Sequence, residues 1–199
     1  MADFAAINDV STSLVRRLTE ALAALGSATV PAPVAQLHDL STPVSGATPV
    51  LAVFLYEVSE DTVSRNRGPR LTDPPDPTVV KPPMALLLRY LLTPWSTDPS
   101  TQHLMMARVV QALYDDLILE GPQLQGRLSG GREALKLTLA PLNLEERTRI
   151  WWAIQQPYRL SLNYEVRGLR LDAVTTDEWS PVTLGRFELA DAAPNRNVP

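Results

Sequence analysis

The sequence contains no cysteine. Disulfide bonds, thiolate catalysis and cysteine-based zinc sites are therefore excluded, and the composition fits a reducing cytoplasm. An excess of basic residues is also missing, because the formal net charge is −4 and the sequence pI is about 5.2. Proteins that bind nucleic acids draw much of their affinity from neutralising phosphates. We therefore expect no nucleic-acid partner.

Long apolar runs are missing as well. The longest, Met84–Leu92, includes Arg89 and is far shorter than the roughly 20 residues that a membrane-spanning helix needs. The chain begins Met-Ala-Asp-Phe, without the basic stretch and apolar run of a secretory signal. These features predict a cytoplasmic protein that does not insert into a membrane.

Catalytic and cofactor motifs are absent too. The sequence has no phosphate-binding or dinucleotide-binding glycine motif and no nucleophile elbow. Neither histidine, His38 or His103, has a ligand-type residue at metal-binding spacing. The adjacent acids of Asp115-Asp116 and of Glu145-Glu146 do not face each other on a helix. We therefore expect no enzyme activity, cofactor or metal. The alternative is an enzyme with an unfamiliar pocket that joins His103 to Asp115 or Asp116.

Three segments show the periodicity of amphipathic helices, with apolar residues at spacings of three and four. The third begins with a capping box, in which Asn143 is the N-cap and Glu146 stands three residues later. Asp3 and Gly26 are the expected N-cap and stop of the first helix, and Gly121-Pro122 ends the second. The expected helices are Phe4–Leu25, Ser100–Leu119 and about Asn143–Gln156.

Several other segments are rich in β-branched and aromatic residues or alternate between apolar and polar side chains, as strands do. Prolines bound Met84–Leu92 at strand length, and Gly168 marks a bulge in the last clear strand. The order of elements predicts a single α+β domain with a mixed or largely antiparallel sheet and helices packed on it. The expected strands are Val34–Leu40, Val50–Val58, Met84–Leu92, Glu133–Ala140, Tyr158–Leu171 and Val182–Leu189.

Prolines are twice as numerous as glycines, 18 against 9, and six of them lie between Ser59 and Pro83. Loops of this length are uncommon and often functional. The loop holds Arg65, Arg67 and Arg70, which could bind carboxylates on another protein or pair with acids nearby in the sequence. An interface between proteins and a solvated connector remain equally good interpretations.

Trp151 and Trp152 are adjacent on the third expected helix, so their rings point to different sides. One ring should lie in the core. The other is either a second core contact or the anchor of an interface, where tryptophan is favoured.

The sequence also resembles a known family over about residues 4–171. Five segments carry the resemblance: Phe54–Val58, Arg65–Arg67, Pro82–Thr93, Leu137–Glu146 and Ile150–Ser161. They are similar to the tail-terminator or cap proteins of extracellular contractile injection systems. No segment is a catalytic fingerprint, and the specificity comes from their order along the chain.

The resemblance implies a fold like that of phage tail terminators and a structural, non-enzymatic role. Such a protein forms a hexameric ring that closes the distal end of the inner tube and sheath, so its partners are copies of itself and the sheath and tube subunits. The terminator domain would comprise residues 1–172, followed by an extension, 173–199. A tail-completion or adaptor protein from another ring is the alternative.

The extension carries the last candidate site. Val182–Leu189 has strand-forming residues after a polar break, so it could add to an exposed sheet edge on the sheath or on the next cap subunit. Val182, Leu184 and Phe187 would anchor that contact. The competing interpretation is a strand packed on its own domain.

Overall fold

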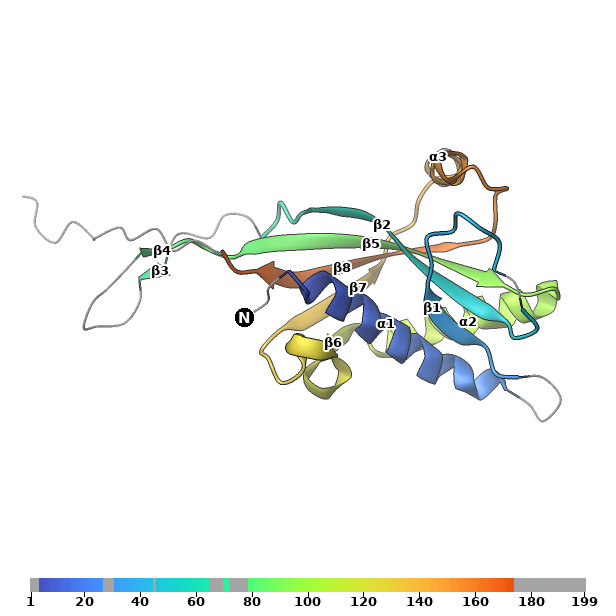
Figure 1. Ribbon diagram of the computed structural model, residues 1–199, viewed down its shortest axis with the longest axis horizontal. Coiled ribbons are helices and arrows are strands. Elements are labelled where there is room, and N and C mark those ends of the chain that lie inside the picture. The colour runs from blue at the N-terminus through green and yellow to red at the C-terminus, as the bar shows by residue number, and fades with distance from the viewer. Residues whose placement is uncertain (1–3, 27–30, 45, 65–69, 72–78, 174–199) are drawn as a thin grey trace, which may run out of the picture.

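Six strands form one mixed, curled sheet in the computed structural model, which describes residues 4–26, 31–44, 46–64, 70–71 and 79–173 (Figure 1). The strand order is β1-β2-β5-β8-β7-β6, with β1 parallel to β2 and all other neighbours antiparallel. The expected α+β domain with a mixed sheet is therefore confirmed. The strands are β1 (Val34–Leu37), β2 (Val50–Glu60), β5 (Met84–Trp95), β6 (Ile118–Glu120), β7 (Ala134–Leu139) and β8 (Leu162–Leu171).

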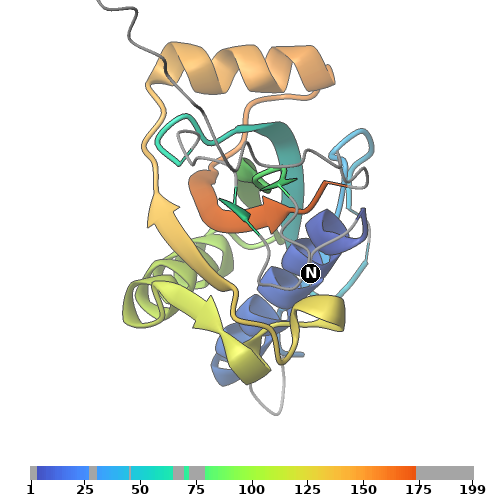
Figure 2. The ribbon, with the colours of Figure 1, turned by 90° about the vertical axis from the view of Figure 1, so that its left-hand side faces the viewer.

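The helices lie on both faces of this sheet (Figure 2). Helix α1 (Ala6–Leu22), extended by the 3-10 turn η1 (Ala23–Leu25), and α2 (Pro99–Asp115) cover one face, which we call the inner face. Helix α3 (Leu144–Ile154) stands over the opposite, outer face. Two further 3-10 turns, η2 (Gly121–Gln123) and η3 (Gly126–Leu128), follow β6.

The main core fills the space between the inner face and helices α1 and α2. Alternate residues of the central strand β5 enter it, so Leu86, Leu88, Tyr90 and Leu92 are all nearly or fully buried. This alternation follows from the two-residue repeat of a strand. From the helix side the same core receives the predicted apolar stripe of α1, namely Val10, Leu14, Leu18 and Leu22.

Polar groups also fix α1 in the fold. The buried Asp9 accepts a hydrogen bond from the backbone N–H of Arg127 at 3.0 Å, and Ser13 accepts one from Gln125 at 2.8 Å. Gly126 approaches so closely that an added Cβ would lie 2.3 Å from a carboxylate oxygen of Asp9, and its φ is +59°. The segment Gly126–Gly131 therefore begins as a 3-10 turn held against α1.

The predicted bulge at Gly168 is confirmed. Its φ is +101°, and the register between β5 and β8 shifts between Leu86 and Leu88. Pro94, expected to end its strand, instead lies inside β5 and is paired with Leu51 of β2. The pairing of β5 with β8 ends at Leu92. Pro94 has no N–H to donate, but at its position there is no β8 residue to accept a hydrogen bond.

Other boundaries also differ from the sequence prediction. Helix α2 ends at Asp115, because the chain turns there into edge strand β6. Strand β8 begins at Leu162 rather than at Tyr158, and the side chains of Tyr158 and Leu160 are 45% and 42% exposed. Val34–Leu40 forms the expected edge strand, although only as far as Leu37. The expected N-cap Asp3 lies outside the described residues, and Ala5 precedes α1 without a side-chain cap.

The stretch Ser59–Pro83 is not a continuous loop. It begins with the last two residues of β2 and contains two short strands, β3 (Arg70–Leu71) and β4 (Val79–Val80), which pair antiparallel with each other. Tertiary pairing, which a local composition rich in proline does not reveal, decides this organisation.

Candidate assembly surface

Helix α3 is fixed at its start by the capping box that the sequence predicts. The side chain of Asn143 accepts a hydrogen bond from Glu146 N at 2.8 Å, and the Glu146 carboxylate accepts one from Asn143 N at 2.9 Å. Arg147 donates two further hydrogen bonds to the carbonyl of Leu142. Hydrogen bonds of these three side chains therefore fix the start of α3.

The two adjacent tryptophans of α3 point to opposite sides, as predicted. Trp151 is 1% exposed and lies in a second, smaller core on the outer face, together with Leu91 and Trp95 of β5. Its ring makes an edge contact with Tyr158, with centroids 6.5 Å apart. Trp152 is 81% exposed, so it is not a second core contact. The other interpretation, an interface anchor, stays a prediction.

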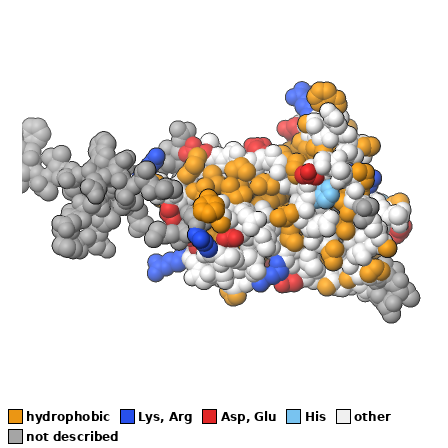
Figure 3. Space-filling view, viewed as in Figure 1, with side chains coloured by type: hydrophobic (Ala, Val, Ile, Leu, Met, Phe, Trp, Pro, Cys, Tyr) orange, Lys and Arg blue, Asp and Glu red, His pale blue; other side chains and the backbone are white. Residues whose placement is uncertain are grey.

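A second large apolar side chain of α3 is also exposed. Leu144, two turns earlier, is 67% exposed, and Arg149 and Glu145 form an ion pair at 2.7 Å on the solvent side. In the space-filling view, hydrophobic and basic side chains project together from this helix (Figure 3). A large aromatic ring surrounded by such groups is typical of an interface between proteins.

A row of ion pairs crosses the outer face between α3 and the end of β2. Arg89 of β5 donates to Glu57 of β2 at 2.7 Å and to Glu165 of β8 at 3.0 Å. Arg167 of β8 donates to Glu165 at 3.0 Å and to Asp61 at 2.7 Å. We call these five residues the charged row. The sequence analysis missed it, although the alternating polar residues of β8 were a signal for its position.

Burial and hydrogen bonding act against each other on the pKa of Glu165. Partial burial acts to raise the pKa, but the hydrogen bonds from Arg167 and Arg89 outweigh it, so the pKa lies below its usual value. The hydrogen bond with Glu57 is the main reason that the pKa of Arg89 is raised. Next to the row, burial raises the pKa of Tyr56 to about 12, and its hydroxyl donates to Asn163 at 2.9 Å. Both shifts favour the charged forms of Glu165 and Arg89, which lie at the centre of the row.

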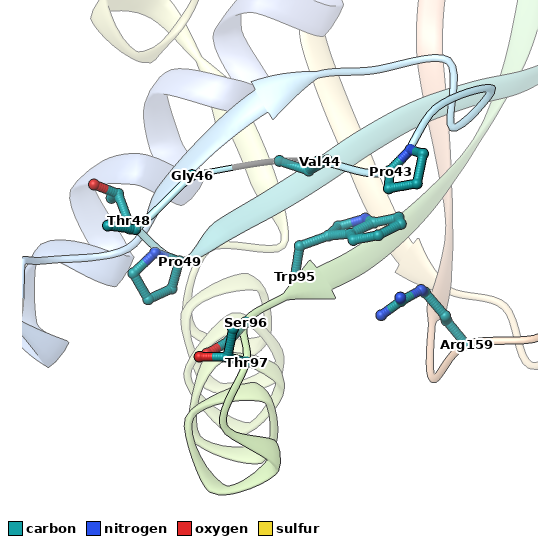
Figure 4. A pocket seen from close by; sticks show the side chains of 10 residues that line it. Pro43, Val44, Gly46, Thr48, Pro49, Trp95, Ser96, Thr97 and Arg159 are labelled. Carbon is teal, nitrogen blue, oxygen red and sulfur yellow. The ribbon is translucent and has the colours of Figure 1, made fainter.

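A concavity of about 410 Å³ lies at the far end of β5 (Figure 4). Its floor is Trp95, over which the Arg159 guanidinium stacks at 3.9 Å from the ring centroid, and Pro43 and Pro49 form part of its wall. The described residues that line it include no histidine, aspartate or glutamate.

The alternative catalytic grouping of His103 with Asp115 or Asp116 is not assembled. His103 and Asp115 are exposed near opposite ends of α2, and twelve residues of helix span roughly 18 Å. Asp116 is instead paired with Arg17, and His38 Nδ1 accepts a hydrogen bond from Leu40 N at 2.8 Å. Among the described residues, no group of three potential metal ligands occurs. Within the same residues, no helix is long and apolar enough to cross a bilayer.

The remaining residues that the sequence singled out are only partly described. Arg65 and Arg67 lie outside the described residues, as do Val182, Leu184 and Phe187. Arg70 begins strand β3, so its backbone alone is placed. Their roles stay predictions.

Comparisons with known proteins identify a family and two solved structures that this chain is similar to. The family model described as the Pvc16 N-terminal domain matches residues 9–184. The fold is similar to the sheath/tube terminator of PVC, an extracellular contractile injection system, with a TM-score of 0.57 and 22% identity over 92% of this chain. It is also similar to the tube-terminating cap of the anti-feeding prophage, with a TM-score of 0.59 and 20% identity over 94% of this chain.

The chain covers 64% and 62% of these two solved chains, so it spans less than two thirds of either one. No curated protein matches it. The two structural matches support the fold, and the family match extends over most of the chain. This protein belongs to the family of the Pvc16 N-terminal domain.

Proposed function

We propose that this protein is a structural subunit of the cap that terminates the sheath and tube of a contractile injection particle. The observation that carries the proposal is the similarity of fold, over more than nine tenths of the chain, to a sheath/tube terminator and to a tube-terminating cap. Membership of the Pvc16 N-terminal domain family supports it. The subunit acts by binding other subunits and has no catalytic role.

The cap is a hexameric ring whose partners are other copies of this chain and the terminal sheath and tube subunits. Residues 1–172 form the ring domain, and 173–199 form an extension that reaches a neighbour. The ring is assembled in the cytoplasm and stays in the particle. A surface rich in exposed apolar groups supports this role, because large exposed rings such as Trp152 mark contacts between proteins.

Two sites form the contacts between subunits in this proposal. Trp152 is an anchor on α3, and Arg65, Arg67 and Arg70 of the proline-rich segment reach acidic groups of an adjacent subunit. Replacing all three arginines with glutamate should weaken capping while the purified subunit stays folded. Trp152→Ala should do the same, whereas Leu144→Ala, which removes a smaller exposed group, should weaken capping less.

The direct experiment removes this subunit from a particle-producing strain and images the particles by electron microscopy. A terminator predicts loss of length control or tube that lacks sheath, and restoring the full chain should restore capped particles. Particles of normal length and with normal sheath would contradict the proposal. A defect confined to another ring of the particle would identify an adaptor instead.

A further inference from the structure

Strand β2 has one open edge. Its first edge pairs with β5 along most of its length, from Val50 to Glu60. Its second edge pairs with β1 only from Val50 to Val53, because β1 ends at Leu37. Among the described residues, no strand pairs with this second edge beyond Val53. The segment from Phe54 to Val58 therefore offers unpaired backbone groups to an additional strand.

The direction of these backbone groups follows from the hydrogen bonds on either side. Val53 accepts a hydrogen bond from His38 N at 3.1 Å across the second edge, so Leu55, two residues later, points the same way. Beyond the register shift between Leu55 and Glu57, Asp61 N donates to Ala85 of β5 at 2.9 Å. The odd-numbered residues there face β5, and Val58 faces the open edge. Both Leu55 and Val58 can accept a ladder partner.

Beside this edge lies a shallow, mostly apolar groove of about 600 Å³. Phe4 and Ile7 of the α1 end, Leu37 of β1, and Val53 and Leu55 of β2 line it. Phe4 is 90% exposed and Leu37 is 47% exposed, as is Val58 further along the same edge. This edge carries exposed apolar side chains and neither proline nor lysine, the two residues that most directly block an added strand, so it can accept one on either side of the register shift.

We propose that this edge accepts residues 182–189 of a second copy of the chain as an added strand. The backbone groups of Leu55 and Val58 supply the ladder contacts, and alternate apolar side chains of the incoming segment enter the groove. This inference rests on the proposed function, since it names the contact that joins neighbouring cap subunits.

The position of the chain end supports this occupant. Strand β8 ends at Leu171 beside Met84 of β5, so the extension leaves the sheet at the end where β2 also finishes. When extended, residues 172–181 span up to about 33 Å, enough to bring 182–189 to a neighbouring subunit. Donor and acceptor are different parts of the chain, because the extension follows β8 and β5 lies between β8 and β2 in the sheet. Such a contact is heterologous, and repeated through a closing rotation it generates a ring.

The absence of natural cysteines permits a direct test by disulfide crosslinking of the full chain. One variant carries Val58→Cys and is labelled with ¹⁵N. The other is unlabelled and carries Leu184→Cys. Val182→Cys and Thr183→Cys are made in parallel, because the experiment must also determine which residue of the incoming segment lies opposite Val58. The two are mixed at ~100 µM and oxidised, and linked pairs are identified by mass spectrometry. Docking holds the thiols at an effective concentration in the millimolar range or above, so we expect mixed dimers at ~10-fold or more over the collisional level.

The matched control for the acceptor is Val63→Cys, since Val63 is 83% exposed and lies five residues from Val58, beyond β2. Mixed dimers no more abundant than with this control would overturn the inference. A chain that carries both cysteines and forms only an internal disulfide would overturn it too, because the segment would then occupy its own edge.

A second variant separates this inference from the proposed function. Val58→Pro removes the N–H that faces the open edge and leaves the β5 pairing intact, and Val58→Ile keeps that N–H as a control. We expect particles made with Val58→Pro to lose their caps and those made with Val58→Ile to keep them. Normal capping by a folded Val58→Pro subunit would overturn the strand contact and leave the terminator role standing. The terminator role is tested separately, by removing the whole subunit, and fails if the particles are then normal or are defective only in another ring.

Discussion

The inner face of the sheet is a continuous apolar layer under α1 and α2, whereas the outer face is divided. Near α3 the outer face has a small core around Trp151 and Trp95, and toward the end of β2 it has the charged row. The two faces share the backbone of β5, whose alternate residues supply Leu88 and Tyr90 to one and Arg89 and Leu91 to the other. One strand thus joins a region specialised for stability to one with a smaller core, half-exposed charges and, on α3, an exposed ring.

The largest expected effect tests whether the small outer core contributes to the stability of the fold. Trp151→Ala should lower the free energy of unfolding by about 3–5 kcal/mol, because it removes a fully buried ring from a site that can collapse only partly. Trp152→Ala, one residue away and exposed, should change it by less than about 0.5 kcal/mol. Urea unfolding followed by circular dichroism measures both, and equal effects would contradict the assignment of one ring to the core.

The charged row should contribute less than either core. Glu165→Gln leaves Arg89 paired only with Glu57 and Arg167 only with Asp61, so we expect a loss of about 1 kcal/mol. The control is Glu145→Gln on α3, which breaks a pair whose side chains are 77% and 71% exposed and should cost no more than a few tenths of a kcal/mol. A variant of Glu165 as stable as the control would show that the row contributes nothing measurable.

The hydroxyl groups of two tyrosines, one on each face of the sheet, allow the stability of the two faces to be compared. Tyr90 on the inner face shares a buried 2.8 Å hydrogen bond with Ser11, and Tyr56 on the outer face donates to Asn163. Tyr90→Phe should cost about 1 kcal/mol, and Tyr56→Phe about half as much because water reaches the outer face. Chemical denaturation of both variants would give the order, and a larger loss at Tyr56 would reverse the comparison.

Acid should weaken the outer face first. The pKa of Glu165 is lowered in the folded state, so its contribution to stability is present above the unfolded value of 4.5 and is lost as the pH falls through the lower folded value. The free energy of unfolding of the native protein should therefore fall with decreasing pH below about 4.5. The fall should be less steep in Glu165→Gln. Identical pH profiles for the two proteins would exclude a role for this carboxylate.

The sequence predicted the elements whose signal is local. The capping box of Asn143, the apolar stripe of α1 and the bulge at Gly168 depend on residues within a few positions of one another, and all three were confirmed. The end of α2 and the continuation of β5 through Pro94 were predicted wrongly. Both depend on which strand lies alongside, and that partner comes from a distant part of the chain.

The candidate site divides in the same way. The opposed rings of Trp151 and Trp152 followed from the helical repeat, because adjacent residues of a helix point to different sides. The charged row could not be found in advance, since Glu57, Arg89 and Glu165 come from three strands whose register had to be known first. The open edge of β2 was also hidden, because a strand's sequence does not show how far its neighbour extends.

By itself, the sequence determined an α+β domain of ordinary composition with a resemblance to injection-particle caps. It could do so because hydrophobic periodicity and helix capping act over a few residues and leave a readable pattern. Only the tertiary structure decided which face became the apolar core, which carboxylates met which guanidiniums, and where the sheet was left open. Those features depend on strand order and register, and a shift of one residue would have turned every side chain of a strand to the opposite face.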